Sequence, residues 1–513
     1  MKTLSFHEFS ELSKIFRAVP LHREMMADML TPVSLFQRLK DHFPDSKCFL
    51  FESVEHGTNI SRYSFVGYGP VESLVSKNGS TWIQKESIEL NPEECPEPHY
   101  LSDDFYTELT RFLERYKAPE IDNLPSFTGG LVGYSSYDTI RQVDPIGEFG
   151  IDDLHLPDAV WSFYDKVFAF DHVYQKLFVI HLVLLEGNET EAELKDFYQH
   201  GLDTLEGMKV VLRSPELSDR SPFFIPEEPS EKALIPTSST THEQFLSMVE
   251  KAKQYIFEGD AFQIVLSQRF ELPFNGTSVD LYRSLRVINP SPYLFCLDLV
   301  DFQLIGSSPE ILVQSNKGEI TLLPIAGTRP RGETIQEDLA MEKNLLSDEK
   351  EIAEHTMLID LGRNDLSRVC SSGSVRMMRE LTIERFSHVM HIVSEIKGVL
   401  KDGKTSADAL KSCFPAGTVS GAPKIRAMQI IEELEPFRRG PYAGAVGYFD
   451  LSGNMDTCIT IRTICLVNRK AYIQAGAGIV ADSDPQKEYE ETRHKAGALF
   501  RAVELAQQIH TLA

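Results

Sequence analysis

Apolar residues spaced three and four apart predict the first clear helix of the chain, directly after Thr31. Threonine is a good N-cap, and Pro32 suits the first position of a helix. Val33, Phe36 and Leu39 then lie on one face of that helix. The pattern predicts an amphipathic helix that packs one side against a core.

Alternating β-rich runs predict strands elsewhere in the chain. Residues 166–170 and 176–185 are two such runs, and the polar pair Asp171-His172 follows the first, which is typical of a hairpin. Residues 458–463 also alternate, and a continuous strand there would put Arg462 on the same face as Cys458. An arginine inside a strand needs a counter-charge, either a bound anion or a protein carboxylate.

A change in composition divides the chain, whose 513 residues are enough for two domains or one large multilayer domain. Acidic residues, prolines and serines dominate residues 186–241, with short helical pieces between them, and residues 221–241 have the composition of a linker. We therefore predict an N-terminal region, 1–185, a variable segment and linker, 186–241, and a catalytic region, 242–513. A helix over 242–258 opens the last region.

One short motif occurs in both of the longer regions. Gly130-Leu-Val-Gly-Tyr134 resembles Gly444-Ala-Val-Gly-Tyr448. Chance is the simpler explanation for five residues. The alternative is that each region contains a similar strand that lies unusually close to another backbone.

Charge and cysteine usage exclude several classes of function. The net charge of −25 makes nucleic acid and anionic membranes poor partners, so an anionic substrate would require local arginine, lysine or a divalent cation. The seven cysteines are scattered and form no C-x-x-C pair, which argues against a disulfide framework or a structural zinc site. With no apolar run of membrane-spanning length and no signal peptide, we expect a reduced, cytoplasmic protein.

Three glycine-containing stretches offer groups that bind anions. In Leu322–Gly332 (LLPIAGTRPRG), Gly327 permits close approach, Thr328 supplies a hydroxyl, and two arginines offer forks for a carboxylate. Phe414–Lys424 (FPAGTVSGAPK) precedes a helix without the spacing of a Walker A loop, and Gln474–Gly478 (QAGAG) is a strand almost without side chains. Taken singly, each stretch is equally well explained as a surface loop, a glycine-rich connection or close packing.

Acidic and titratable residues supply the remaining candidate chemistry. Glu354 lies three residues after Glu351 on one predicted helix, and Glu491 lies three after Glu488 on another, which suits Mg²⁺ but also describes ordinary solvated faces. His391 lies in a predicted strand, 386–393, where a core histidine is the common explanation. Glu310 follows a strand end.

Four stretches, taken together and in their order along the chain, resemble the chorismate-utilising enzymes: Pro324–Gly332, Glu354–Asp365, Ala416–Lys424 and Gln474–Gly478. The resemblance covers about residues 240–505 and extends to the N-terminal region through Thr31-Pro-Val33 and Phe51-Glu-Ser53. It implies an α+β fold, a four-layer α/β/β/α sandwich with large, mainly antiparallel sheets.

The resemblance also narrows the reaction, because members of the family differ in their nucleophile. Those that make aminodeoxychorismate carry a lysine where this chain has Ala326, and those that make isochorismate carry a lysine base where it has Gln263. The resemblance therefore implies that ammonia attacks chorismate and that the products are anthranilate and pyruvate, with aminodeoxychorismate and then isochorismate synthesis as the rivals. A non-catalytic chain that only binds tryptophan is an alternative of another class.

The family's site residues map onto this chain as follows. Glu354 and Glu491 would hold Mg²⁺ on the ring carboxylate, with help from Thr418 and the backbone of Gly476, Ala477 and Gly478. Arg462 and Tyr442 would meet the enolpyruvyl carboxylate, and Gly327 and Thr328 would line the pocket. Glu310 is the expected general acid and His391 the expected base.

Regulation and ammonia supply are implied in the same way. Ser53 and the turn Pro292, Tyr293 and Leu294 resemble the tryptophan-binding elements of the family, so tryptophan is the expected inhibitor. No glutaminase pattern is found in the chain, which implies a separate glutamine amidotransferase subunit as the ammonia source.

Overall fold

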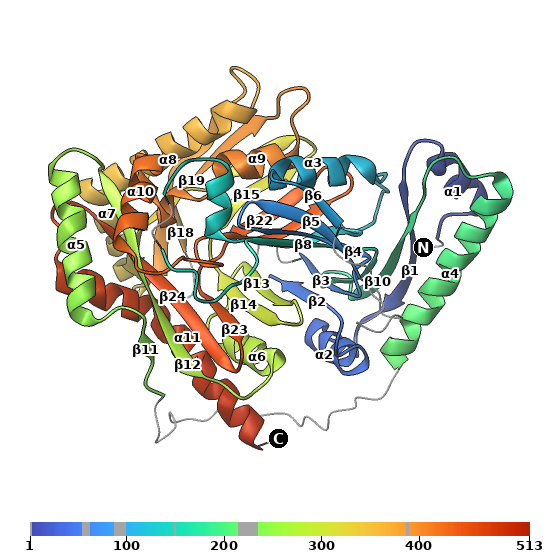
Figure 1. The fold of residues 1–513 in the computed structure, drawn as a ribbon, viewed down its shortest axis with the longest axis horizontal. Coiled ribbons are helices and arrows are strands. Elements are labelled where there is room, and N and C mark those ends of the chain that lie inside the picture. The colour runs from blue at the N-terminus through green and yellow to red at the C-terminus, as the bar shows by residue number, and fades with distance from the viewer. Residues whose placement is uncertain are drawn as a thin grey trace.

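A computed structural model describes residues 3–53, 62–86, 99–147, 150–213, 234–385 and 389–512. Within these residues, two 12-stranded sheets lie face to face and helices cover their outer sides (Figure 1). All pairings between named strands are antiparallel. The four-layer α/β/β/α sandwich predicted from the resemblance is therefore confirmed.

The first sheet, sheet A, combines strands from both ends of the chain. Its order is β1 (Ala18–Met26), β10 (Lys176–Leu184), β9 (Lys166–Asp171), β3 (Tyr63–Tyr68), β2 (Cys48–Glu52), β13 (Tyr293–Asp298), β14 (Phe302–Ser308), β23 (Thr463–Val467), β24 (Lys470–Ile479), β12 (Gln263–Pro273) and β11 (Thr237–Ser238), with β20 (Gly421–Ala422) beside β12.

Sheet B is built in the same mixed way. Its order is β17 (Ile325–Pro330), β19 (Val389–Val399), β16 (Glu319–Leu322), β15 (Ile311–Asn316), β22 (Met455–Ile459), β21 (Ala445–Asp450), β7 (Gly130–Ser135), β8 (Ala159–Tyr164), β4 (Glu72–Lys77), β5 (Ser80–Lys85) and β6 (His99–Ser102), with β18 (Arg376–Arg385) beside β19.

Each sheet has its own set of helices. Those on sheet A are α2 (Pro32–His42), α4 (Glu191–Arg213), α5 (His242–Phe257), α6 (Ser278–Ile288), α10 (Lys424–Leu434) and α11 (Pro485–Leu512), and α1 (Phe6–Ser13) packs on α4 and β1. Those on sheet B are α3 (Phe105–Arg115), α7 (Ile335–Leu346), α8 (Glu349–Val369) and α9 (Ser406–Cys413). Two short 3-10 helices are η3 (Tyr137–Gln142) and η4 (Gly417–Val419).

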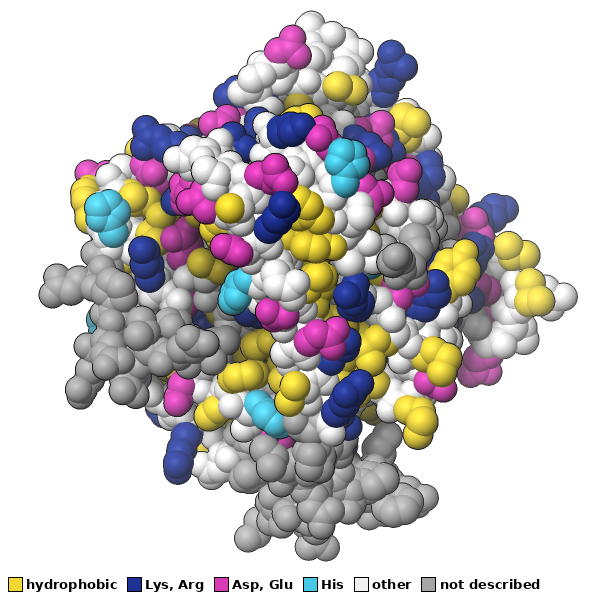
Figure 2. Space-filling view, turned by 90° about the vertical axis from the view of Figure 1, so that its right-hand side faces the viewer, with side chains coloured by type: hydrophobic (Ala, Val, Ile, Leu, Met, Phe, Trp, Pro, Cys, Tyr) yellow, Lys and Arg dark blue, Asp and Glu magenta, His cyan; other side chains and the backbone are white. Residues whose placement is uncertain are grey.

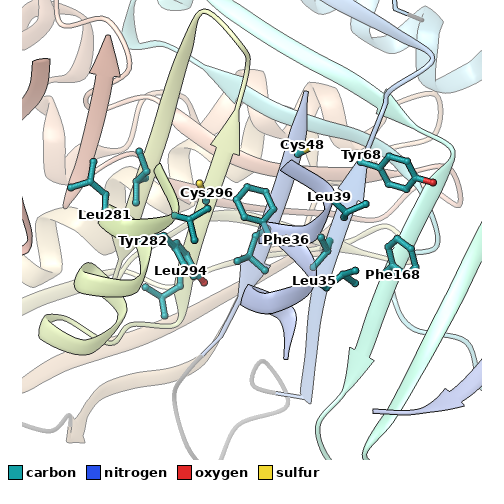
Figure 3. Packing of buried hydrophobic residues seen from close by; sticks show 14 of the residues in the cluster. Leu35, Phe36, Leu39, Cys48, Tyr68, Phe168, Leu281, Tyr282, Leu294 and Cys296 are labelled. Atoms are coloured by element: carbon teal, nitrogen blue, oxygen red, sulfur yellow. The ribbon is translucent and has the colours of Figure 1, made fainter. Parts of the chain in front are cut away.

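The helix predicted after Thr31 is α2, and it shows how one helix face is buried. The Thr31 hydroxyl accepts a hydrogen bond from the backbone N–H of Ser34 at 3.1 Å. Leu35, Phe36 and Leu39 are fully buried against sheet A (Figure 3). A second core, which contains side chains from both sheets, fills the space between them.

Strands from the predicted N-terminal and catalytic regions pair with each other in both sheets: β2 pairs with β13, and β7 pairs with β21. The division into an N-terminal region, a linker and a catalytic region therefore remains a prediction about what each segment does. Residues 186–241 contain α4, a helix of 23 residues and far longer than the short pieces expected.

The repeated glycine motif has a structural cause. Its two copies form β7 and β21, which are neighbours, and Gly133 lies directly opposite Gly447. A side chain on either glycine would clash with a backbone carbonyl of the strand on its other side. The chance explanation was therefore wrong, and the close-approach alternative is confirmed.

One strand prediction was also wrong. Residues 458–463 do not form a continuous strand, because β22 ends at Ile459 in sheet B and β23 begins at Thr463 in sheet A. Arg462 lies in this crossover with a φ of 50°, a left-handed conformation that strands do not contain.

The face of the molecule in Figure 2 carries charged side chains of both signs, with acidic and basic side chains interspersed among the coloured residues. None of the described helices combines the length and the hydrophobicity that crossing a bilayer requires. Six of the cysteines are described, and each is a buried free thiol.

Candidate active site

His391 is held on β19 by the neighbouring strand β17. Its Nδ1 lies 3.0 Å from the carbonyl oxygen of Gly327 and 3.0 Å from the hydroxyl of Thr328. A carbonyl can only accept a hydrogen bond, so Nδ1 carries the proton and Nε2 is the nitrogen able to take one. Burial lowers the pKa of His391, the Gly327 carbonyl opposes this effect, and the charge of Arg462 adds to it. The ring is therefore neutral near pH 7 and can act as a base.

Gly327 itself is the extra residue of a β-bulge. The register between β17 and β19 shifts between Ala326 and Thr328, and Gly327 has a φ of 69°. This bulge turns the Gly327 carbonyl toward the ring of His391.

Glu310 follows β14 at the point where the chain passes from sheet A to sheet B. The Thr418 hydroxyl, on η4, donates a hydrogen bond to Glu310 Oε1 at 2.8 Å. Burial raises the pKa of Glu310 to about 7, although Thr418 and the charge of Lys495 both act to lower it. A large fraction of Glu310 is therefore protonated near neutral pH, which suits a general acid.

Arg462 presents a partly buried guanidinium next to Tyr442. It donates a hydrogen bond to the backbone carbonyl of Lys495 at 2.8 Å. Within the described residues, Arg462 has this hydrogen bond to a backbone carbonyl but no ion pair with a carboxylate. A bound anion would supply the counter-charge that a buried guanidinium needs. Burial lowers its pKa, which Tyr442 opposes, and the guanidinium remains charged.

The Gly-Ala-Gly stretch of β24 lies between these groups and α11. Lys495 Nζ donates a hydrogen bond to the Gly476 carbonyl at 3.0 Å, and a Cβ atom on Gly476 would lie 2.6 Å from the Tyr442 hydroxyl oxygen. Gly478 lies against the amide of Gln263 in the same way. Ala477 points into the core on the opposite face, so only its backbone can meet a ligand.

The two glutamates predicted to bind a metal lie on different helices, and each contacts a residue that lies against this strand, Gln263 or Lys495. Glu354 on α8 accepts a hydrogen bond from Gln263 Nε2 at 3.0 Å, and Glu491 on α11 forms an ion pair of 2.7 Å with Lys495. Burial raises the pKa of Glu488, and the charge of Glu491 adds to the effect. These carboxylate oxygens are ligands that Mg²⁺ prefers, and a cation would relieve the repulsion between Glu488 and Glu491. Among the described residues, no three acidic, histidine or cysteine side chains already form a metal cage.

The two arginines of the LLPIAGTRPRG stretch bind protein carboxylates. Arg329 pairs with Asp348 at 2.6 Å and with Glu351 at 3.1 Å, while Arg331 pairs with Asp338 at 2.7 Å. They tie β17 to the start of α8 and to α7. The expectation that these guanidinium groups bind a ligand carboxylate was therefore wrong. The alternative, a surface loop with solvated arginines, does not describe them either, because each arginine pairs with an acidic side chain.

The predicted tryptophan-binding residues lie together in another part of sheet A. Leu294 on β13 is directly opposite Glu52, the residue before Ser53. Tyr293 reaches across to sheet B, where its hydroxyl donates a hydrogen bond to Asp456 at 2.8 Å. Pro292 lies in the turn before β13. Within the described residues, the buried Ser53 hydroxyl has no hydrogen-bond partner.

Lys495 was not identified from the sequence, although it contacts several parts of the site. It holds the Gly476 carbonyl and Glu491, and it acts on Glu310. The available signal was its position four residues after Glu491 on one helix, which places the two side chains on the same face.

Comparison with known proteins agrees with this arrangement. A family model described as chorismate binding enzyme matches residues 24–501. Proteins named anthranilate synthase component 1 from Acetivibrio thermocellus and Pseudomonas putida are each 44% identical, with 98% of this chain and 98% of each relative covered.

Solved structures show the same fold. Anthranilate synthase component I from Streptococcus pneumoniae TIGR4 is 38% identical, with a TM-score of 0.73 over 93% of this chain and 99% of that chain. The menaquinone-specific isochorismate synthase MenF from Escherichia coli is only 18% identical and covers 96% of this chain and 97% of its own, but its TM-score of 0.68 shows a common fold. The chain belongs to the chorismate binding enzyme family.

Proposed function

We propose that this chain converts chorismate and ammonia to anthranilate and pyruvate, the first committed step of tryptophan biosynthesis. The observation that carries the proposal is the state of the two positions where related enzymes hold a lysine. Ala326 is a buried methyl group, and the Gln263 amide donates to Glu354. Neither can attack the ring or activate water, so ammonia is the nucleophile that remains.

Mg²⁺ is the cofactor that we propose for this site, with Glu354 and Glu491 as its protein ligands. When bound, it supplies positive charge at the ring carboxylate of chorismate and draws electron density from the ring. The charge of Lys350 on α8 acts on Glu488 of α11, so the acidic beginnings of the two helices lie near each other, which supports this choice.

Chorismate carries two carboxylates, and the site offers separate partners for them. Arg462 and Tyr442 would bind the enolpyruvyl carboxylate, because Arg462 is a guanidinium that pairs with no carboxylate among the described residues. The backbone of Gly476–Gly478 would receive the ring carboxylate. Gly327 and Thr328 would form the wall on the His391 side.

The reaction then requires several proton transfers. Ammonia bonds to C2 of the ring while the C4 hydroxyl leaves as water, Glu310 donates the proton that this leaving group requires, and the ammonium formed at C2 releases one proton to become the amine. His391 then removes the proton from C2, the C3–O bond breaks, and the released enolpyruvate takes up a proton to become pyruvate while the ring becomes aromatic.

The proposal is tested by incubating the purified chain with chorismate, Mg²⁺ and an ammonium salt at mildly alkaline pH. We expect the blue fluorescence of anthranilate, and no product without ammonium or with a chelator present. A folded chain that consumes chorismate without ammonium would instead be an isochorismate synthase. A chain that binds tryptophan but consumes no chorismate would be a regulatory subunit.

Replacing Gly476 with alanine is expected to raise the KM for chorismate about tenfold, a change of roughly 1.4 kcal/mol. The new methyl group would lie 2.6 Å from the Tyr442 hydroxyl and 2.9 Å from the Leu266 carbonyl, so tyrosine or strand must move. Gly497→Ala on α11 is the control, since no atom lies within 4 Å of its added Cβ. Equal KM values for the two variants would remove Gly476 from the substrate site.

We also propose that tryptophan inhibits the enzyme at Ser53, Pro292, Tyr293 and Leu294. The unpartnered hydroxyl of Ser53 supports this proposal. Ser53→Ala is expected to raise the inhibition constant for tryptophan roughly five- to tenfold, the value of one hydrogen bond near 1 kcal/mol. Inhibition is measured relative to each variant's own uninhibited rate, with Ser102→Ala on β6 as control. An unchanged inhibition constant would exclude Ser53 from the site.

A separate glutamine amidotransferase subunit is proposed as the ammonia source, because the relatives named above are described as component 1 of their enzyme. The expected location is the cytoplasm, where the described buried thiols would stay reduced.

A further inference from the structure

Arg439 and Glu435 form a buried ion pair directly after α10. Their exposed fractions are 3% and 6%, and two hydrogen bonds of 2.6 and 2.9 Å join the guanidinium to the carboxylate. Burying such a pair costs desolvation that its own attraction hardly repays. The contacts that the pair makes with its surroundings point to a role other than stabilising the fold.

The guanidinium also binds two backbone carbonyls. Arg439 Nη1 donates to Val419 at 2.7 Å, and Nη2 donates to Val265 at 2.6 Å. Val419 is the residue after Thr418. Val265 on β12 is the pairing partner of Gly478 on β24. One side chain therefore links the η4 loop to the strand beside the Gly-Ala-Gly stretch.

The carboxylate extends the same connection. Glu435 Oε1 accepts hydrogen bonds from the Ser267 backbone N–H at 2.7 Å and from its hydroxyl at 2.9 Å. Ser267 is opposite Gly476 and also accepts a hydrogen bond from Gln474 at 2.8 Å. The backbone position of β24 at Gly476 thus depends on a strand that Glu435 fixes.

The guanidinium also lies over two aromatic rings. Its carbon is 5.6 Å from the ring centre of Tyr442 and 4.7 Å from that of Tyr137. Tyr442 is the residue whose hydroxyl lies against Gly476. Arg439 therefore contacts, directly or through one neighbour, three separate walls of the candidate site.

We infer that the Arg439–Glu435 pair is a positioning device, which holds Thr418, Tyr442 and the Gly476–Gly478 backbone in register for chorismate. Neither residue is proposed to touch the substrate. The inference rests on the proposed function, since it assigns these walls to chorismate binding and to the acid Glu310.

Arg439→Lys is the informative change, because lysine keeps the charge but cannot fork between Glu435 and two carbonyls. We expect the KM for chorismate to rise at least tenfold. Loss of the Thr418 contact to Glu310 should also move the alkaline limb of the pH–rate profile to higher pH, since that hydrogen bond lowers the Glu310 pKa.

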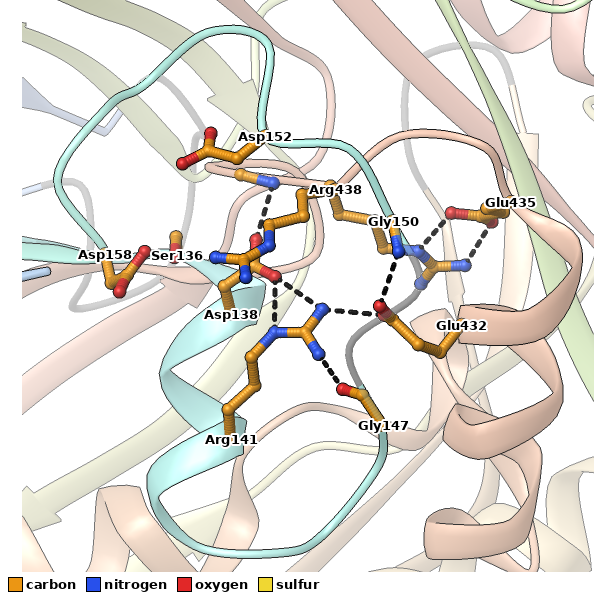
Figure 4. Close-up of polar contacts among 12 residues, drawn as sticks. Ser136, Asp138, Arg141, Gly147, Gly150, Asp152, Asp158, Glu432, Glu435 and Arg438 are labelled. Carbon is orange, nitrogen blue, oxygen red and sulfur yellow. Dashed lines mark hydrogen bonds and ion pairs between the residues drawn. The ribbon is translucent and has the colours of Figure 1, made fainter. Parts of the chain in front are cut away.

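Arg141→Lys is the matched control. Arg141 forms a comparable partly buried ion pair of 2.6 Å with Glu432 in the last turn of α10, and it also binds Asp138 (Figure 4). Its guanidinium donates to the Gly147 carbonyl and to Glu432, and no dashed line joins it to Glu435 in the same view. It should lower stability without changing the KM or the pH profile.

Equal changes in KM and pH profile for both variants, or no change in either quantity for Arg439→Lys, would overturn the inference. If Arg439→Lys does not fold, Glu435→Gln tests the same device. It removes the negative charge that pairs with Arg439, while its amide oxygen can still accept the hydrogen bond from Ser267. Wild-type turnover is measured in parallel. If the wild type makes no anthranilate, the proposed function fails, and calorimetric chorismate binding by the same variants then decides the positioning role.

Discussion

Replacing Glu310 with glutamine is expected to lower kcat for anthranilate formation by roughly 10²–10⁴-fold, the usual contribution of a general acid. Glutamine has almost the same shape, and its amide oxygen can still accept the Thr418 hydrogen bond, so the fold and the KM should change little. Only the acidic proton for the departing hydroxyl is lost. Steady-state rates with saturating chorismate and ammonium measure the effect.

The pH dependence gives this prediction a second readout. Burial raises the pKa of Glu310 to about 7, and the acid must be protonated to act, so the rate falls as pH rises above about 7. Ammonia itself loses a proton over the same range, so rates are compared at a constant concentration of uncharged ammonia. Glu319→Gln changes a half-exposed carboxylate of sheet B and should keep the wild-type profile. A full rate or an unchanged alkaline limb in Glu310→Gln would show that another group is the acid.

Glu354→Gln should reduce Mg²⁺-dependent turnover by roughly a hundredfold or more. The substitution removes a negative charge and one carboxylate oxygen from the proposed metal ligands, and hard cations prefer carboxylate oxygen. The variant should need far more Mg²⁺ for half-maximal rate. Its unfolding transition should stay close to that of the wild type, because Glu354 is only half-buried at the surface of α8.

Asp360→Asn provides the comparison on the same helix, since Asp360 is 69% exposed and, among the described residues, pairs only with Arg363 at 3.5 Å. It should leave the Mg²⁺ dependence unaltered. If Glu354→Gln also kept the wild-type Mg²⁺ requirement, Glu354 could not be a ligand.

Local patterns predicted the elements whose causes are local. The Thr31 cap and the apolar face of α2 depend on residues within one helix, and the hairpin of β9 and β10 depends on one turn. The four-layer fold came from the family resemblance, because periodicity alone does not say which strands share a sheet. That limit explains the error at 458–463, where alternation continues while the chain changes sheets at Arg462.

Pairing between distant charges was equally hidden in the sequence. Arg329 and Arg331 looked like ligand forks because their partners Asp348 and Asp338 come later in the chain and are brought close only by α7 and α8. Arg439 showed no signal either, since its carbonyl acceptors lie on η4 and β12. Residue types predicted the proposed acid, the proposed base and the acidic helices, whereas the charged residues that contact them could be identified only from the fold.

Incubating the chain with chorismate, Mg²⁺ and ¹⁵N-labelled ammonium, and then identifying the products by NMR and mass spectrometry, tests the central claim most directly. We expect anthranilate that carries the label on the carbon next to its carboxylate, together with an equal amount of pyruvate. Label para to the carboxylate in a product that keeps its enolpyruvyl group, or unlabelled isochorismate, would contradict it.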